Sequence, residues 1–155
     1  KNTGRPITKD NPTEDYKSNY IDSPNTPLYP FGHGLSYTTF EYSEIKLSNN
    51  KVRESEILKV SSIITNTGEY DGHEVVQLYI HDKVASITRP VKELKDFKKI
   101  FLRKGESKTV TFEINSDDLK FYNNGKLMIE SGEFEIAISG TSDFEFNKTF
   151  NLTLN

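Results

Sequence analysis

The sequence lacks several of the features on which specific functions depend. Its 155 residues include no cysteine and no tryptophan, and the absence of cysteine excludes disulfide bonds and thiolate metal ligands. No apolar run approaches the roughly 18 residues that a membrane-spanning helix requires. The 20 basic residues are outnumbered by 23 acidic ones, and the net charge of −3 offers no electrostatic attraction for nucleic acid or an anionic membrane. We therefore expect neither as a partner.

Proline is scarce over most of the chain but concentrated at its start. Five of the six prolines lie within residues 1–30, in a polar segment without helical or strand periodicity. This composition predicts an extended arm over residues 1–38. Aromatic side chains are spaced along the arm like anchors for another surface: Tyr16, Tyr20, Tyr29 and Phe31. The chain begins with Lys rather than Met, so we expect it to be a piece of a longer protein.

From residue 39 onward, apolar residues recur at every second position, which is typical of half-buried antiparallel strands. In residues 74–81, Val76, Leu78 and Ile80 share one face, while Gln77, Tyr79 and His81 share the other. The same alternation predicts inward faces in four further segments, carrying Leu58, Val60 and Ile64; Val110, Phe112 and Ile114; Phe134, Ile136 and Ile138; and Phe144, Phe146, Phe150, Leu152 and Leu154. About seven strands are expected over residues 39–155.

Three local features refine this reading. The alternation breaks phase within residues 38–47, which predicts a β-bulge or a strand that switches sheets. Residues 116–122 are expected to form one helical turn capped by Ser116. Turn-forming residues at 66–72, 104–107 and 130–133 separate the strands. Together these patterns predict an all-β fold, an antiparallel two-sheet β-sandwich of immunoglobulin or fibronectin type III character with an extended N-terminal arm. A closed barrel is the weaker alternative.

The stretch YPFGHGLSY, residues 29–37, resembles a catalytic turn at first sight. It lacks the serine between glycines that a nucleophile elbow requires, so a catalytic triad built on His33 has little support from the sequence. We interpret it instead as a hinge between the arm and the sandwich. Pro30 fixes one φ angle, Gly32 and Gly34 permit backbone angles that other residues resist, and apolar area comes from Tyr29, Phe31, Leu35 and Tyr37.

Candidate catalytic and metal-binding residues give little support for an active site. The three histidines, His33, His73 and His81, lack ligand spacing, so no metal site is expected. Paired carboxylates could hydrolyse glycosides, but the candidates fall where solvated side chains are expected: Glu44, Glu74, Asp82, Asp117 and Asp118. The basic run at 89–99 is interpreted as an exposed segment that guards a sheet edge. Tyr79 is the best single candidate for contacting carbohydrate, although cross-strand packing explains it more simply.

Four stretches carry a family resemblance: residues 27–43 (PLYPFGHGLSYTTFEYS), 65–82 (TNTGEYDGHEVVQLYIHD), 86–114 and 132–140 (GEFEIAISG). In order along nearly the whole chain, they resemble the C-terminal fibronectin type III-like domain of glycoside hydrolase family 3, the β-glucosidases, β-xylosidases and their relatives. Residues 2–6 (NTGRP) resemble the linker that leaves the family's middle domain.

The resemblance implies a non-catalytic C-terminal module, because the family's nucleophile and acid/base lie in domains that this chain does not contain. The parent would be a retaining, exo-acting glycosidase that needs no cofactor, periplasmic or secreted by analogy with bacterial relatives. The expected partners are its catalytic domains, on which residues 39–155 would pack while residues 1–38 join them. Two alternatives stay open, a polysaccharide-binding module and a free-standing adhesion domain.

Overall fold

The computed structural model describes residues 26–154. It divides the chain into two units, Lys1–Phe31 and Gly32–Asn155, so the predicted anchors Tyr16 and Tyr20 lie outside the described residues. The second unit is built almost wholly from strands, which are β1 (Phe40–Tyr42), β2 (Lys46–Leu47), β3 (Lys51–Arg53), β4 (Leu58–Asn66), β5 (Gly72–Asp82), β6 (Glu93–Leu102), β7 (Ser107–Ile114), β8 (Phe121–Asn123), β9 (Lys126–Met128), β10 (Gly132–Ser139) and β11 (Lys148–Thr153). A single helical turn, α1 (Ser116–Leu119), precedes β8.

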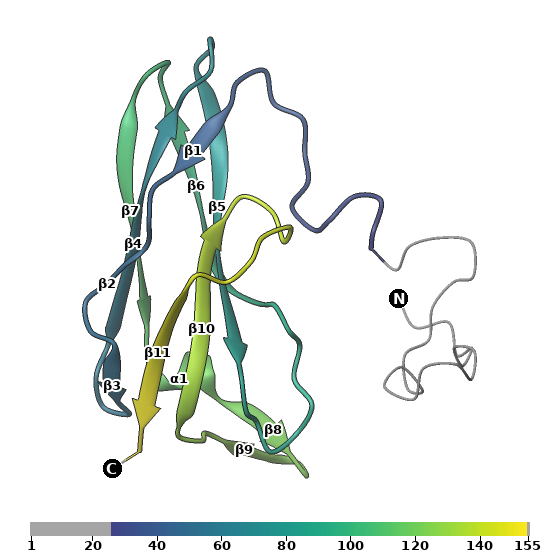
Figure 1. Ribbon diagram of the computed structural model, residues 1–155, viewed down its shortest axis with the longest axis vertical. Coiled ribbons are helices and arrows are strands. Elements are labelled where there is room, and N and C mark those ends of the chain that lie inside the picture. The colour runs from purple at the N-terminus through teal and green to yellow at the C-terminus, as the bar shows by residue number, and fades with distance from the viewer. Residues whose placement is uncertain (1–25, 155) are drawn as a thin grey trace. The chain divides into compact units, whose positions relative to one another are not determined.

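Nine of the described strands form the two sheets of a sandwich, and β8 and β9 form a separate two-stranded sheet (Figure 1). In the four-stranded sheet, β4 pairs with β7 on one side and with β1 and β2 on the other. The five-stranded sheet has the order β3-β11-β10-β5-β6, and its pairs are antiparallel except for β3 with β11. The predicted two-sheet sandwich is therefore confirmed, and the alternative of a closed barrel is wrong because the sheets are separate.

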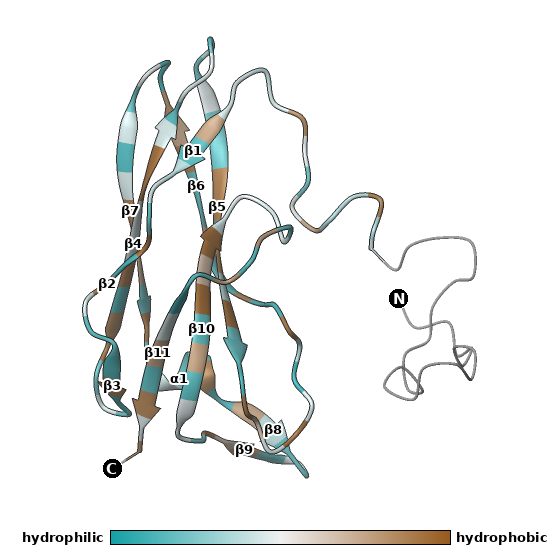
Figure 2. Ribbon diagram, in the orientation of Figure 1, coloured by the Kyte–Doolittle hydropathy of each residue, from teal (hydrophilic) through white to brown (hydrophobic). Residues whose placement is uncertain are grey.

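The core lies between the sheets and is filled by the alternating residues of the long strands. Figure 2 shows this alternation as successive brown and teal bands along β10. Each buried Val, Leu, Ile or Phe contributes about 1.5–3 kcal/mol relative to an exposed one. The rings of Phe134 and Phe150 stack at 5.3 Å between centroids. All of the inward positions predicted on β4, β5, β7 and β10 are buried.

The phase break in residues 38–47 is a β-bulge. Tyr42 pairs with Ile64, and Lys46 pairs with Ser61. The four steps from Tyr42 to Lys46 are therefore matched by only three steps along β4, so the segment from Tyr42 to Lys46 contains one extra residue. The bulge turns both Tyr42 and Ile45 toward the interior although they lie three positions apart.

Two local predictions need correction. The cap of α1 is Asn115 rather than Ser116: its side chain accepts a hydrogen bond from the Asp117 backbone N–H at 2.8 Å, and the Asp118 carboxylate accepts one from the Asn115 N–H. The last strand begins at Lys148, so Phe144 and Phe146 precede it. Their rings lie on the outer side of the five-stranded sheet, 5.0 Å from Tyr79 and 5.8 Å from His81, rather than on the face of Phe150.

Candidate functional site

The predicted hinge, residues 29–37, is divided between the two units. Tyr29, Pro30 and Phe31 belong to the first unit, and Gly32 through Tyr37 belong to the second. The side chains of Tyr29, Phe31 and His33 are exposed, and those of Leu35 and Tyr37 are 97% and 93% exposed. The Leu35 and Tyr37 side chains are available to a neighbouring surface, and the hinge itself stays a prediction.

The two glycines of this segment are not equivalent. Gly32 has a φ of +82°, and a Cβ there would lie 2.5 Å from Nε2 of Gln77 and 2.8 Å from the carbonyl oxygen of Gly140. Gly32 is therefore required both by backbone angle and by close contact with the five-stranded sheet. Gly34 has no positive φ, and nothing would lie within 4 Å of its Cβ. Nothing around Gly34 requires a glycine at that position, and its part in the bend stays a prediction.

A buried asparagine fastens the segment just after the predicted hinge. The Thr38 hydroxyl donates to Oδ1 of Asn66 at 2.5 Å, and Asn66 donates through Nδ2 to the backbone oxygens of Tyr70 and Leu102. Both Thr38 and Asn66 are buried. Sequence reasoning assigned Asn66 to a turn, but its position continues the inward parity of Leu58, Val60 and Ile64, and that parity was the available signal.

Tyr79 has the predicted outward parity, but its side chain is only 2% exposed. Phe144 covers the Tyr79 ring, and the Tyr79 hydroxyl donates to Oε1 of Gln77 at 2.6 Å. Lys92 holds Phe144 in place, since Nζ lies 4.3 Å from the centroid of that ring and donates to its backbone oxygen. A Tyr79 ring buried in this way is closed to carbohydrate, because residues 141–147 cross over this face. The packing role that the sequence favoured fits the structure, although Phe144 supplies the contact rather than a cross-strand neighbour.

A half-buried carboxyl group links the two sheets. The Tyr42 hydroxyl on β1 donates to Oε1 of Glu74 on β5 at 2.5 Å. Burial raises the pKa of the Glu74 carboxyl, and the hydrogen bond from Tyr42 offsets only part of that effect. Burial, with the neighbouring Glu74 second, also raises the pKa of Tyr42 well above its ordinary value. This pair holds the sheets together at the end where the chain enters the sandwich.

An ion-pair network fastens the loop between β5 and β6. Nη1 of Arg89 lies 3.1 Å from Oδ2 of Asp82, and the side chains are 8% and 4% exposed. Nη2 of Arg89 reaches Oε2 of Glu93 at 2.9 Å, and the guanidinium lies 5.1 Å from the centroid of the Phe121 ring. Residues 93–102 lie at the edge of the five-stranded sheet, as the edge-guarding interpretation requires, but the basic run is not exposed throughout, because the Arg89 side chain is only 8% exposed.

The candidate catalytic carboxylates are all engaged by the fold itself. Each has its own partner: Asp118 in the helix cap, Asp117 with Lys120, Glu44 with Lys148, Glu74 with Tyr42, and Asp82 with Arg89. The expectation that they are solvated is wrong for Asp82, which is buried, and for Glu74, which is half-buried. Within residues 26–154, no three His, Asp or Glu side chains are grouped as metal ligands. These partners support a structural role for all five carboxylates.

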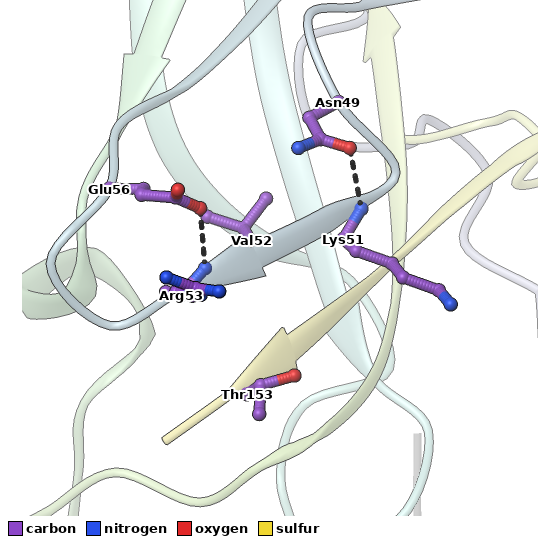
Figure 3. Close-up of a pocket in the computed structure, with 6 residues that line it drawn as sticks. All are labelled: Asn49, Lys51, Val52, Arg53, Glu56 and Thr153. Carbon is purple, nitrogen blue, oxygen red and sulfur yellow. Dashed lines mark hydrogen bonds between the residues drawn. The ribbon is translucent and has the colours of Figure 1, made fainter. Parts of the chain in front are cut away.

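The polar side chains around a surface hollow of about 490 Å³, near the C-terminal end of β11, also have structural roles (Figure 3). Two of its lining side chains are bound to nearby backbone. Oδ1 of Asn49 accepts from the Lys51 N–H, and Oε2 of Glu56 accepts from the Arg53 N–H. These hydrogen bonds hold the turns beside β3 in place, and the hollow presents no acid–base pair.

Comparison with known proteins adds to this geometry. The sequence profile of the fibronectin type III-like domain matches residues 74–142. The chain is 47% identical over 138 residues to a periplasmic β-glucosidase of Salmonella typhimurium, and 48% identical over 135 residues to a putative β-xylosidase of Formosa agariphila. These matches cover 88% and 86% of this chain but 18% of each relative. The chain is a fibronectin type III-like domain of the type found at the C-terminus of family 3 glycoside hydrolases.

A solved structure agrees with this assignment. The fibronectin type III-like domain superimposes on part of a Listeria innocua β-glucosidase, crystallised as a mutant with laminaribiose, with a TM-score of 0.82 and 41% identity. The match covers 97% of this chain and 21% of that one. The domain thus spans about one fifth of the relatives that it matches, and their enzymatic activity is a property of much longer chains.

None of the helical structure within residues 26–154 has the length and apolar character needed to cross a bilayer.

Proposed function

We propose that this domain is the non-catalytic C-terminal module of a family 3 glycoside hydrolase, and that it packs on the catalytic domains and stabilises them. The parent would be a β-glucosidase-like enzyme that hydrolyses terminal β-linked glucose or related sugars. The observation that carries the proposal is the match of most of this chain to about one fifth of β-glucosidases and β-xylosidases. The five candidate carboxylates support it, because each is engaged by a partner within the fold.

The proposal assigns different roles to the two parts of the chain. Residues 1–38 would be the strap that leaves the catalytic domains, and residues 39–155 the packed sandwich. The almost complete exposure of the Leu35 and Tyr37 side chains supports this, since exposed apolar side chains beside an entry segment mark a surface that another body covers. By analogy with the periplasmic relative, the enzyme would work in the periplasm or outside the cell.

A turnover assay tests the non-catalytic part of the proposal. The 155-residue chain is incubated with a nitrophenyl β-glucoside, and the full-length protein serves as the positive control. We expect release of nitrophenol by the full-length protein and none by the chain alone. Turnover by the chain that falls when one of its carboxylates is replaced by its amide would overturn the assignment.

Polysaccharide binding is the second candidate. It would use exposed rings, which the described surface offers at Tyr37 and Phe97 rather than at Tyr79. Titration of the chain with cello-, xylo- and laminari-oligosaccharides separates the two functions. Saturable binding that is lost in Phe97→Ala or Tyr37→Ala would favour the binding module, and no binding is expected for a packing module.

A further inference from the structure

The outer faces of the two sheets have different chemistry. On the four-stranded sheet, the outward residues of β4 and β7 pair as Lys59 with Glu113, Ser61 with Thr111, and Thr65 with Ser107. Ile63 interrupts this polar face as a single half-exposed aliphatic side chain on β4. Such a face needs no cover, because charged and hydroxyl groups are well solvated.

The outer face of the five-stranded sheet is apolar where β5 meets β6. Parity and register place four exposed apolar side chains on it: Val75, Leu94, Phe97 and Phe101. We call these the β5–β6 apolar face. Phe97 is 62% exposed although it lies in the middle of β6, which is the last strand of its sheet. Large apolar groups on an edge strand favour association. The β5–β6 apolar face therefore has the chemistry of a covered surface, whereas the polar face of the four-stranded sheet has that of a surface exposed to solvent.

The segment through which the chain enters the sandwich borders this face. Gly32 lies against Gln77, the residue that pairs with Phe97 across the β5–β6 ladder. Leu35 lines the same hollow of about 550 Å³ as Val75. The chain that precedes the sandwich is therefore attached beside the β5–β6 apolar face and not beside the polar face.

We infer that the catalytic body of the same polypeptide covers the β5–β6 apolar face, with Leu35 and Tyr37 at its border. The inference rests on the proposed function and adds the surface through which it acts. Because the chain spans 18% of a relative such as the Salmonella enzyme, the proposed function implies that a much larger catalytic body would be tethered through the entry segment. Lys99 pairs with Val75 on this face and has no ion pair among the described residues, so the covering surface should offer a carboxylate opposite it.

Site-specific photocrosslinking in the full-length protein tests the inference. Benzoylphenylalanine replaces Phe97 in one variant and Ile63 in a matched control on the opposite sheet, and crosslinked peptides are identified by mass spectrometry. We expect the Phe97 variant to give crosslinks between β6 and the catalytic body, in several-fold higher yield than the Ile63 variant. Equal or higher yield from Ile63 would overturn the assignment of the face while leaving the packing function intact.

The other outcomes are equally decisive. Failure of both positions to crosslink to the catalytic body would contradict the proposed function itself. Crosslinks from Phe97 that join only two copies of the protein would mean that the face is a self-association surface, which overturns the inference. Protection of Phe97 from crosslinking by laminari- or cello-oligosaccharides would assign the face to sugar and overturn it as well.

A second measurement does not depend on the photoreactive residue. Phe97→Ser and Ile63→Ser are made separately in the full-length protein and in the 155-residue chain. We expect Phe97→Ser to lower the melting temperature of the full-length protein more than that of the chain, because the partner surface is lost only in the former. Equal shifts in both, matching those of Ile63→Ser, would contradict the inference.

Discussion

Replacement of Arg89 by leucine tests how the sandwich holds its longest loop. The substitution removes the guanidinium but keeps apolar bulk over Phe121, so Asp82 is left as a buried carboxylate with a side chain only 4% exposed. Breaking a buried ion pair from one side costs about 3–5 kcal/mol, because the remaining charge stays desolvated. We therefore expect the free energy of unfolding of the 155-residue chain to fall by roughly that amount.

Urea denaturation followed by circular dichroism measures this loss, and a surface pair supplies the control. Lys59 and Glu113 form an ion pair at 3.2 Å with side chains 61% and 58% exposed. Lys59→Ala should cost about 0–1 kcal/mol, since exposed pairs are well solvated. The double variant Arg89→Leu with Asp82→Leu should regain much of the loss, because no unpaired carboxylate is then buried.

Two results would refute this reasoning. If Arg89→Leu costs no more than Lys59→Ala, the network contributes no more than a surface pair. If the double variant has a lower free energy of unfolding than Arg89→Leu, the two substitutions act independently. The loss of stability in Arg89→Leu would then not come from the unpaired Asp82.

Further predictions concern the entry segment and the link between the sheets. Gly32→Ala should destabilise the chain by about 1–3 kcal/mol because of its positive φ, whereas Gly34→Ala should change stability by no more than about 0.5 kcal/mol; equal effects in thermal melts would contradict the contacts of Gly32. Because the folded protein binds the Glu74 proton more tightly than the unfolded chain does, stability should fall as pH rises from the ordinary glutamate pKa through the raised one. Glu74→Gln removes this slope, so urea titrations across that interval should show the variant gaining on the native chain as pH rises, and a native chain that gains instead would show that the pKa is lowered. Thr38→Val should cost about 1–3 kcal/mol by depriving Asn66 of a buried donor, and Thr39→Val on the exposed Thr67 contact is the control.

The periodicity of the long strands could be predicted because one physical cause dominates it. Val60, Phe112 and Phe134 alternate with polar residues, since one side of each strand faces the core and the other faces away from it. The bulge after Tyr42 was also visible as a change of phase. The β8–β9 hairpin was missed although Asn124 and Gly125, both with positive φ, are a strong signal for its turn.

The surroundings of the outward faces could not be predicted, because they depend on segments distant in sequence. Tyr79 is buried by Phe144, which lies 65 positions later and was expected on the core side. Arg89 looked solvated as part of a basic run, but its guanidinium lies 5.1 Å from the ring centroid of Phe121, which comes 32 positions later. Periodicity reports which face a residue occupies and carries no information about what crosses over that face.

The stabilising role is tested most directly by the melting temperature of the catalytic body with and without residues 39–155. The full-length protein and a version that ends at residue 38 are compared by differential scanning calorimetry at equal concentration. Packing of the sandwich on the catalytic domains predicts that the truncated protein melts at a lower temperature. An unchanged melting temperature of the catalytic domains would contradict a stabilising module.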